Sequence, residues 1–175
     1  MSLTRDIGEK EKEKTILPNQ IEQKSEECLI IPEHRIVRGN SLVPLIENGQ
    51  TVKILFGYYK CNEIKRGDIV AYDYTGDKNP IIKIAKGIPG DSFKLKETEN
   101  GWNILINNEI LKNSENNPYL ITGNKYKMLS LYEDNCQNGI PEKTYLLLGN
   151  LISGSVDSTQ FGLIDKSGIL GKVDY

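Results

Sequence analysis

Residues 37–53 read VRGNSLVPLIENGQTVK, and the rest of the chain is organised around this stretch. Ser41 stands between two apolar segments; Gly39 frees the backbone before it, and Pro44 after it can begin a short helical turn. A serine hydroxyl is a weak nucleophile without a base, so a catalytic role requires such a base elsewhere in the chain. Taken alone, the stretch is better explained by a serine that caps a helix.

Length and composition restrict the classes of protein that the chain can belong to. Its 175 residues suffice for one domain with an insertion. The formal charge is only −2, so no general attraction to nucleic acid is expected. Three distant cysteines, Cys28, Cys61 and Cys136, allow at most one disulfide and form no zinc motif. The single histidine, His34, excludes multi-histidine metal sites and is expected in an exposed turn, so we predict no metal or cofactor.

The N-terminal segment differs from the rest of the chain. Residues 1–26 are dense in Lys, Glu and Gln, and we expect a charged, disordered tail before a domain at 27–175. No stretch approaches the ~20 consecutive apolar residues of a spanning helix, and the N-terminus lacks the apolar core of a signal peptide. We therefore expect the chain as given to be soluble.

Short apolar runs between turn residues predict a mostly β fold with few short helices. Asn107 and Asn108 are expected to form a tight hairpin turn. The residues between about 92 and 142 are predicted to form a β-rich insertion. We expect strands at residues 28–32, 35–38, 51–56, 69–74, 81–86, 92–96, 102–106, 109–112, 126–132, 143–148, 161–164 and 169–173.

Lys83 is a candidate base in the stretch PIIKIAKGIPGD, residues 80–91. Strand alternation puts Lys83 and Lys86 on opposite faces. If the face of Lys83 is buried, desolvation lowers its pKa, and the neutral amine can then take a proton from a serine. The alternative is a lysine on the solvent face of an edge strand, and on this stretch alone that alternative is favoured.

A third stretch, residues 149–162, reads GNLISGSVDSTQFG. Together with the Gly39-x-Ser41-x-x-Pro44 stretch and the Lys83 stretch, it resembles the conserved boxes of type I signal peptidases in order and separation. These are Ser-Lys dyad proteases that include the mitochondrial inner-membrane peptidases and a conjugative-transfer branch. The resemblance covers about residues 35–175, and it implies the catalytic β-fold that signal peptidases share with LexA-like repressors.

The resemblance implies a role for each matching residue. Ser41 is expected to be the nucleophile and Lys83 the general base. Ser155 is expected to hydrogen-bond and orient the lysine amine, as a third group does in a triad. Asp157 and Ser158 are expected to brace the loop that carries Ser155.

The resemblance also implies how a substrate binds. The oxyanion hole is expected to use the backbone N–H of Ser41, because Gly39 stands where some members have a hydroxyl. A signal or leader peptide of an exported protein is expected to lie extended between residues 35–38 and 80–83, with small side chains beside the serine. The family acts on the extracytoplasmic side of a membrane, so we expect contact with the membrane surface. Since the chain shows no anchor, we expect either that the given sequence begins after one or that a partner supplies the attachment.

Several positions depart from the family pattern, which predicts a divergent member. Because Thr159 replaces an arginine that pairs with the aspartate, we expect Asp157 to be partly solvated or to pair with Lys86 or Arg38. The replacements are Leu42 for Met, Leu45 for Thr, Ile84 for Arg, Asn150 for Asp and Thr159 for Arg.

Two other kinds of protein are alternatives to a signal peptidase. A self-cleaving LexA-like repressor requires a DNA-binding domain and an Ala-Gly cleavage site, but neither Ala71 nor Ala85, the only alanines, is followed by glycine. A non-catalytic descendant that binds peptides or scaffolds a complex stays open because of the lost arginines. Retention of Ser41, Lys83 and Ser155 argues against it.

Overall fold

The computed structural model describes residues 28–74, 79–133, 135–136 and 138–175, and the tail predicted at residues 1–26 lies outside them. Strands predominate among these residues, so the predicted mostly β fold with few short helices is confirmed. Neither α-helix in the described part is long and apolar enough to cross a membrane. The elements are β1 (Ile31–Ile36), β2 (Thr51–Phe56), η1 (Tyr58–Lys60), β3 (Ile69–Tyr72), β4 (Ile81–Gly87), β5 (Phe93–Thr98), β6 (Gly101–Ile106), β7 (Glu109–Ile110), β8 (Leu120–Ile121), α1 (Gly123–Glu133), β9 (Thr144–Leu148), α2 (Ser158–Phe161), β10 (Ile164–Asp165), η2 (Lys166–Gly168) and β11 (Ile169–Asp174).

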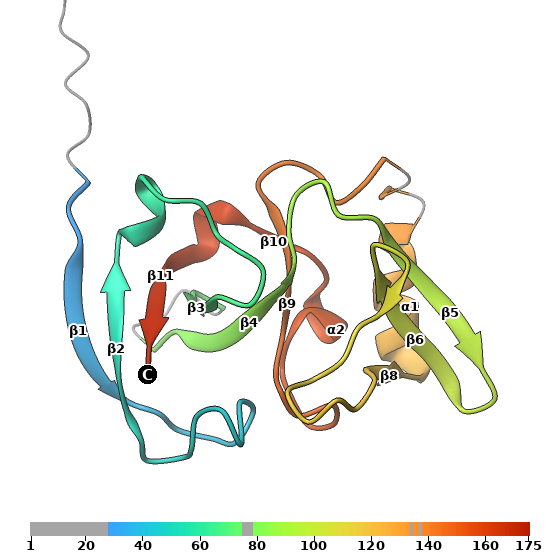
Figure 1. Cartoon of the computed structure of the whole chain (residues 1–175), viewed down its shortest axis with the longest axis horizontal. Coiled ribbons are helices and arrows are strands. Elements are labelled where there is room, and N and C mark those ends of the chain that lie inside the picture. Colours follow the sequence, from blue (N-terminus) through green and yellow to red (C-terminus); the bar gives the residue numbers. More distant parts are fainter. Residues whose placement is uncertain (1–27, 75–78, 134, 137) are drawn as a thin grey trace, which may run out of the picture.

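The strands form two antiparallel sheets (Figure 1). The larger has the order β1-β2-β11-β3-β4-β9-β10, and the smaller consists of β5, β6 and β7 with β8 paired to β6. The smaller sheet and α1 are formed by the chain between β4 and β9, and they lie together on the right of Figure 1. This is the segment for which the sequence predicts a β-rich insertion.

Both faces of the larger sheet are covered by apolar side chains. Along β3, Ile69 packs into one buried cluster, whereas Val70 packs into another on the opposite face, as strand alternation requires. The cluster of Ile69 also contains Leu42 and Ile46 from the turn that carries Ser41. The turn is therefore anchored in the core of the domain.

One predicted strand is wrong, because residues 126–132 belong to helix α1. Tyr126, Leu129 and Tyr132 recur every third residue, and all three pack into the cluster formed with the smaller sheet. Leu131, outside this packed face, is 67% exposed. Because Leu131 is apolar although it faces solvent, the apolar residues of this segment do not follow a clear helical period. The sequence alone therefore favours a strand here.

Two further predictions of strands need correction. The strands expected at 28–32 and 35–38 are a single strand, β1, so His34 is exposed as predicted but lies in a strand and not in a turn. Pro32 fits there because β1 lies at the edge of the sheet, where β2 is its one partner among the described strands. Residues 161–164 are the end of α2 and the start of β10, since an aspartate side chain caps the start of α2 and favours a helical turn.

Other predictions are confirmed. β2 spans the predicted residues 51–56. Asn107 and Asn108 form the tight turn between β6 and β7, with φ values of 53° and 65°. Asparagine tolerates this left-handed backbone better than most residues, which explains the Asn-Asn pair.

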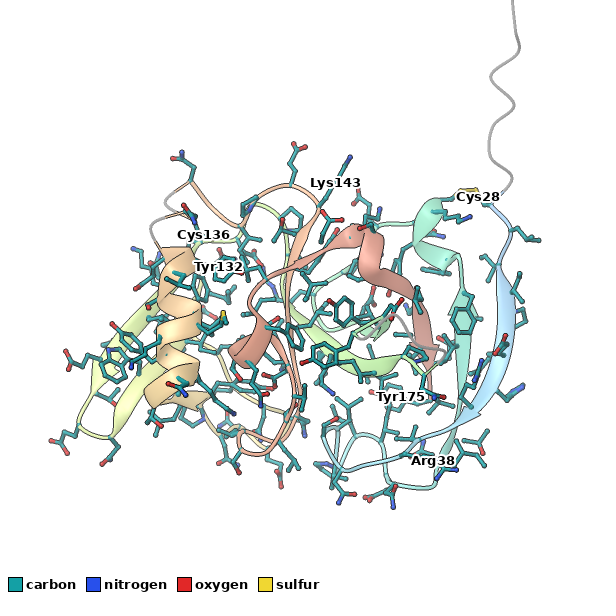
Figure 2. All side chains as sticks on the ribbon, turned by 180° about the vertical axis from the view of Figure 1, so that it is seen from behind. Cys28, Arg38, Tyr132, Cys136, Lys143 and Tyr175 are labelled. Atoms are coloured by element: carbon teal, nitrogen blue, oxygen red, sulfur yellow. A yellow bond between two sulfur atoms is a disulfide. The ribbon has the colours of Figure 1, made fainter. Side chains whose placement is uncertain are left out.

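Cys28 and Cys61 form a disulfide, and Cys136 is a buried free thiol. This agrees with the limit of one bridge set by three cysteines. Cys28 and Cys136 lie on different sides of the molecule in Figure 2, Cys136 beside α1. The bridge ties the segment before β1 to the segment after η1.

Replacing Cys28 by serine is expected to lower the free energy of unfolding by about 4 kcal/mol, because the bridge spans a sequence separation of 33 residues. Urea unfolding with and without a thiol reductant measures this effect. Reductant is expected to lower the midpoint of the wild type and to leave that of Cys28→Ser unchanged. An equal response of the two proteins would contradict the prediction.

Candidate active site

Ser41 lies in the turn between β1 and β2. The N–H groups of Leu45 and Ile46 donate to the carbonyl oxygen of Leu42 (2.8 and 3.2 Å), and the side chains of Leu42 and Ile46 are buried. Gly39 has a φ of 94°, a left-handed conformation that favours glycine. The segment is a turn and not a helix, so the helix-capping alternative for Ser41 is wrong.

Lys83 reaches the serine from β4. Its side chain is buried, and Nζ donates to Ser41 Oγ and to the carbonyl oxygen of Ile82, each at 2.9 Å. The alternative of a lysine on the solvent face is therefore wrong. Two residues that are 42 positions apart in the chain meet at hydrogen-bond distance.

The protonation of Lys83 is shifted by its surroundings. Burial lowers its pKa from 10.5 to about 8, while the negative charge of Asp157 acts in the opposite direction and raises it. Near pH 8 about half of the amines are therefore neutral and able to accept a proton. Among the described residues, no three His, Cys, Asp or Glu side chains gather into a group that could hold a metal ion.

Asp157 is buried behind the dyad of Ser41 and Lys83. Its carboxylate accepts hydrogen bonds from the N–H of Gly149 (3.0 Å) and from both the N–H and the hydroxyl of Thr159 (3.0 and 2.7 Å). Within the described part of the chain no Lys or Arg nitrogen lies within 4.0 Å of it.

The prediction that Asp157 is partly solvated or pairs with Lys86 or Arg38 is wrong. Lys86 instead donates to the carbonyl oxygen of Lys112 at 2.9 Å. Three hydrogen bonds from neutral donors stabilise the buried carboxylate in place of an ion pair. One of the donors is Thr159, which stands in place of the arginine that pairs with the aspartate in the family pattern.

Ser155 lies in the loop before Asp157, but it does not make the predicted hydrogen bond to the lysine amine. Its side chain is buried, and Oγ has no partner among the described residues. The two acceptors of Lys83 are Ser41 Oγ and the carbonyl of Ile82. The loop is braced by Ser158, whose hydroxyl accepts from a backbone N–H of β9 at 2.9 Å.

A groove of about 790 Å³ opens beside the dyad. It lies between residues 35–38 and 80–83, the two segments that were predicted to flank a peptide. β9 pairs with β4 only from Ile84 onward. Residues 81–83 of β4, which precede this pairing, line the groove. The lining residues are His34, Arg35, Ile36, Val37, Arg38, Gly39, Ser41, Leu42, Val52, Ile54, Asn79, Pro80, Ile81, Ile82 and Lys83.

Sequence reasoning missed two residues that contact this site. Tyr119, from the segment before β8, donates its hydroxyl to the carbonyl oxygen of Gly149 at 2.7 Å. Asn150 was noted only as a departure from the family pattern, yet its side chain is fully buried beside the turn of Ser41. The Asn-rich composition of residues 113–117 predicts a turn and nothing about its packing, so no local signal placed either residue at the site.

Comparisons with known proteins agree on one family. The model of the family described as signal peptidase, peptidase S26, matches residues 28–175. Signal peptidase IB of Staphylococcus aureus (strain COL) is 27% identical over 150 residues, which cover 79% of this chain and 74% of that protein. Signal peptidase I of Bacillus caldolyticus is 26% identical over 150 residues, covering 84% and 80%. A crystal structure of a signal peptidase I from Enterococcus faecalis V583 has a TM-score of 0.46 and 21% identity, covering 65% of this chain and 98% of that one.

Lys83→Met is expected to stabilise the protein at pH 7 by an amount on the order of 2 kcal/mol, because it removes a buried ammonium group. Since the folded pKa of about 8 lies below the 10.5 of a free lysine, the folded state releases its proton first. The stability of the wild type therefore rises with pH between about 8 and 10.5, and the advantage of Lys83→Met disappears there.

Urea unfolding of Lys83→Met and wild type at several pH values between 7 and 10.5 checks this. The exposed Lys94→Met serves as a control and is expected to show no such trend. A difference between Lys83→Met and wild type that does not change with pH would contradict the assigned burial of the amine.

Gly149→Ala is expected to destabilise the fold by roughly 1–3 kcal/mol, because a Cβ there overlaps Ser155 Oγ and lies 2.8 Å from the carbonyl oxygen of Ser41. Removing the obstructing side chain with Ser155→Gly is expected to restore part of the loss in the double variant. Thermal unfolding of the two single variants and the double variant measures the coupling. Strictly additive effects would show that the two residues do not meet.

Proposed function

Because this chain belongs to the signal peptidase family, peptidase S26, we propose that it is a serine endopeptidase that removes signal or leader peptides from exported proteins. The observation that carries the proposal is the 2.9 Å hydrogen bond from Lys83 Nζ to Ser41 Oγ, with the amine buried and its pKa lowered to about 8. We assign Ser41 as the nucleophile and Lys83 as the general base.

In the proposed reaction the neutral amine of Lys83 takes the proton of Ser41 as Oγ attacks the scissile carbonyl carbon. The ammonium formed then gives this proton to the leaving amine, and an acyl ester remains on Ser41. Water, deprotonated by Lys83, hydrolyses the ester and regenerates both groups. The negative charge of Asp157 favours the ammonium form of Lys83 and so stabilises it while it holds the proton.

The backbone N–H of Ser41 is the proposed oxyanion donor. No described residue accepts a hydrogen bond from it, so it is available to a developing negative charge. Gly39 has no side chain to offer a second donor.

The groove supports binding of an extended peptide as an added strand along the free edge of β4. Ile36 lines this groove and is 65% exposed, which supports a membrane surface as the setting of the reaction. We propose that the reaction takes place on the extracytoplasmic side of a membrane, because signal peptidases act there. We further infer that residues 27–175 act as one peptidase domain, with 92–142 as its insertion.

A non-catalytic descendant is not favoured, since such a protein has no need to keep an amine buried at hydrogen-bond distance from the serine.

The test is cleavage of a fluorogenic leader peptide with alanine at the residue before the scissile bond and two residues before that. Ser41→Ala and Lys83→Met are expected to lose roughly 10³-fold or more in kcat/KM. Lys94→Met, which removes an exposed lysine of β5 in the smaller sheet, is the control and is expected to retain activity.

The pH dependence tests the base. Because the neutral amine is the active form, kcat/KM of the wild type is expected to rise with pH and to level off above about 8. If the wild type binds the peptide but does not cleave it, even with detergent or lipid present, the non-catalytic alternative is correct.

A further inference from the structure

We propose that Asn150 is a positioning residue for the nucleophile: its side-chain amide locks the turn of Ser41 onto the loop that precedes β8. This inference deepens the proposed function and rests on it for the effect on catalysis. The contacts of Asn150 themselves are independent of any reaction, so they can also be tested without one.

The side chain of Asn150 is fully buried, and both of its N–H groups and its oxygen are hydrogen-bonded. Nδ2 donates to the carbonyl oxygen of Val43 and to Ser114 Oγ, each at 2.8 Å. Oδ1 accepts from the N–H of Ser114 at 3.0 Å. Since a backbone N–H can only donate and a carbonyl can only accept, these partners fix which way the amide points.

The backbone of Asn150 holds the same two segments. Its N–H donates to the carbonyl oxygen of Ser41 at 2.6 Å, and the N–H of Leu151 donates to the same oxygen at 3.1 Å. Its own carbonyl accepts from Asn113 Nδ2 at 3.1 Å. The carbonyls of Ser41 and Val43 are thus both held by this one residue, which fixes the Ser41–Leu42 and Val43–Pro44 peptide planes.

Only an amide satisfies this set of partners. An aspartate, which the family pattern has at this position, has the same shape but no N–H to donate. Its carboxylate would face the carbonyl oxygen of Val43, an acceptor opposite an acceptor, in a buried site. In this chain the amide therefore fits the nucleophile turn and the carboxylate does not.

The amide also makes the smaller sheet part of the catalytic machinery. Asn113 and Ser114 belong to the loop between β7 and β8, and they contact the nucleophile turn through Asn150. A displacement of this loop would be passed to the backbone of Ser41. Small displacements matter, because a shift of about 1 Å in a reacting group can lower the rate ~100-fold.

The test compares Asn150→Asp with Asn62→Asp, using the same leader peptide. Asn62 Nδ2 also donates to a backbone carbonyl at 2.8 Å, that of Tyr58 in η1, so the control loses the same kind of bond away from the site. Asn150→Asp is expected to lower kcat by roughly 10- to 100-fold with KM changed less than about 3-fold. Asn62→Asp is expected to leave both constants unchanged.

Hydrogen exchange gives a readout that needs no activity. In Asn150→Asp the amides of Val43, Leu45 and Ile46, which close the turn, are expected to exchange faster, while those between β5 and β6 keep their protection. If the wild type proves inactive, the proposed function fails, and this exchange pattern alone decides whether Asn150 positions the turn.

Three outcomes would overturn the inference: an unchanged kcat in folded Asn150→Asp, equal losses in both aspartate variants, or uniform exchange across both sheets. If Asn150→Asp does not fold, Ser114→Ala takes its place, since it removes one partner of the amide and leaves the amide itself. A fall in kcat of roughly 3- to 10-fold supports the inference, and an unchanged kcat overturns it.

Discussion

The site depends on one physical constraint, which is that the amine of Lys83 must stay out of water and still touch Ser41. Burial disfavours the charged amine and lowers its pKa to about 8, whereas an exposed lysine stays protonated at neutral pH. The domain satisfies this constraint by placing the lysine on an inner strand of the larger sheet and closing the turn of Ser41 over it. The fold therefore supplies a base that the amino acid alone does not.

A second charge is buried beside the first, and the chain stabilises it without an ion pair. Asp157 lies under Thr159 and Gly149, whose neutral donors replace the arginine of the family pattern. A carboxylate held by N–H and O–H groups keeps its negative charge available to the lysine, since no neighbouring cation neutralises it. In this chain the departures from the pattern thus change how the buried charge is held: neutral donors take the place of an ion pair.

The segment that follows β9 joins the three parts of the site. Gly149 allows Ser155 Oγ and the carbonyl of Ser41 to approach where any side chain would collide. Asn150, directly after it, contacts both the nucleophile turn and the loop before β8. Because β9 also pairs with β4, which carries Lys83, the two sheets and the nucleophile turn share one rigid connection.

The sequence by itself determined the mostly β fold, the single-disulfide limit, the turn of Ser41 and the candidates Lys83 and Asp157, because strand alternation, turn residues and motif spacing are local properties. Only the tertiary structure decided that Lys83 is buried, that Cys28 pairs with Cys61, that residues 126–132 are helical and that Asp157 has neutral partners. It also decided that Ser155 lacks the predicted bond and that Asn150 joins two segments. These features depend on which distant residues exclude water from a group or meet its hydrogen-bonding atoms, and no local pattern in the chain contains that information.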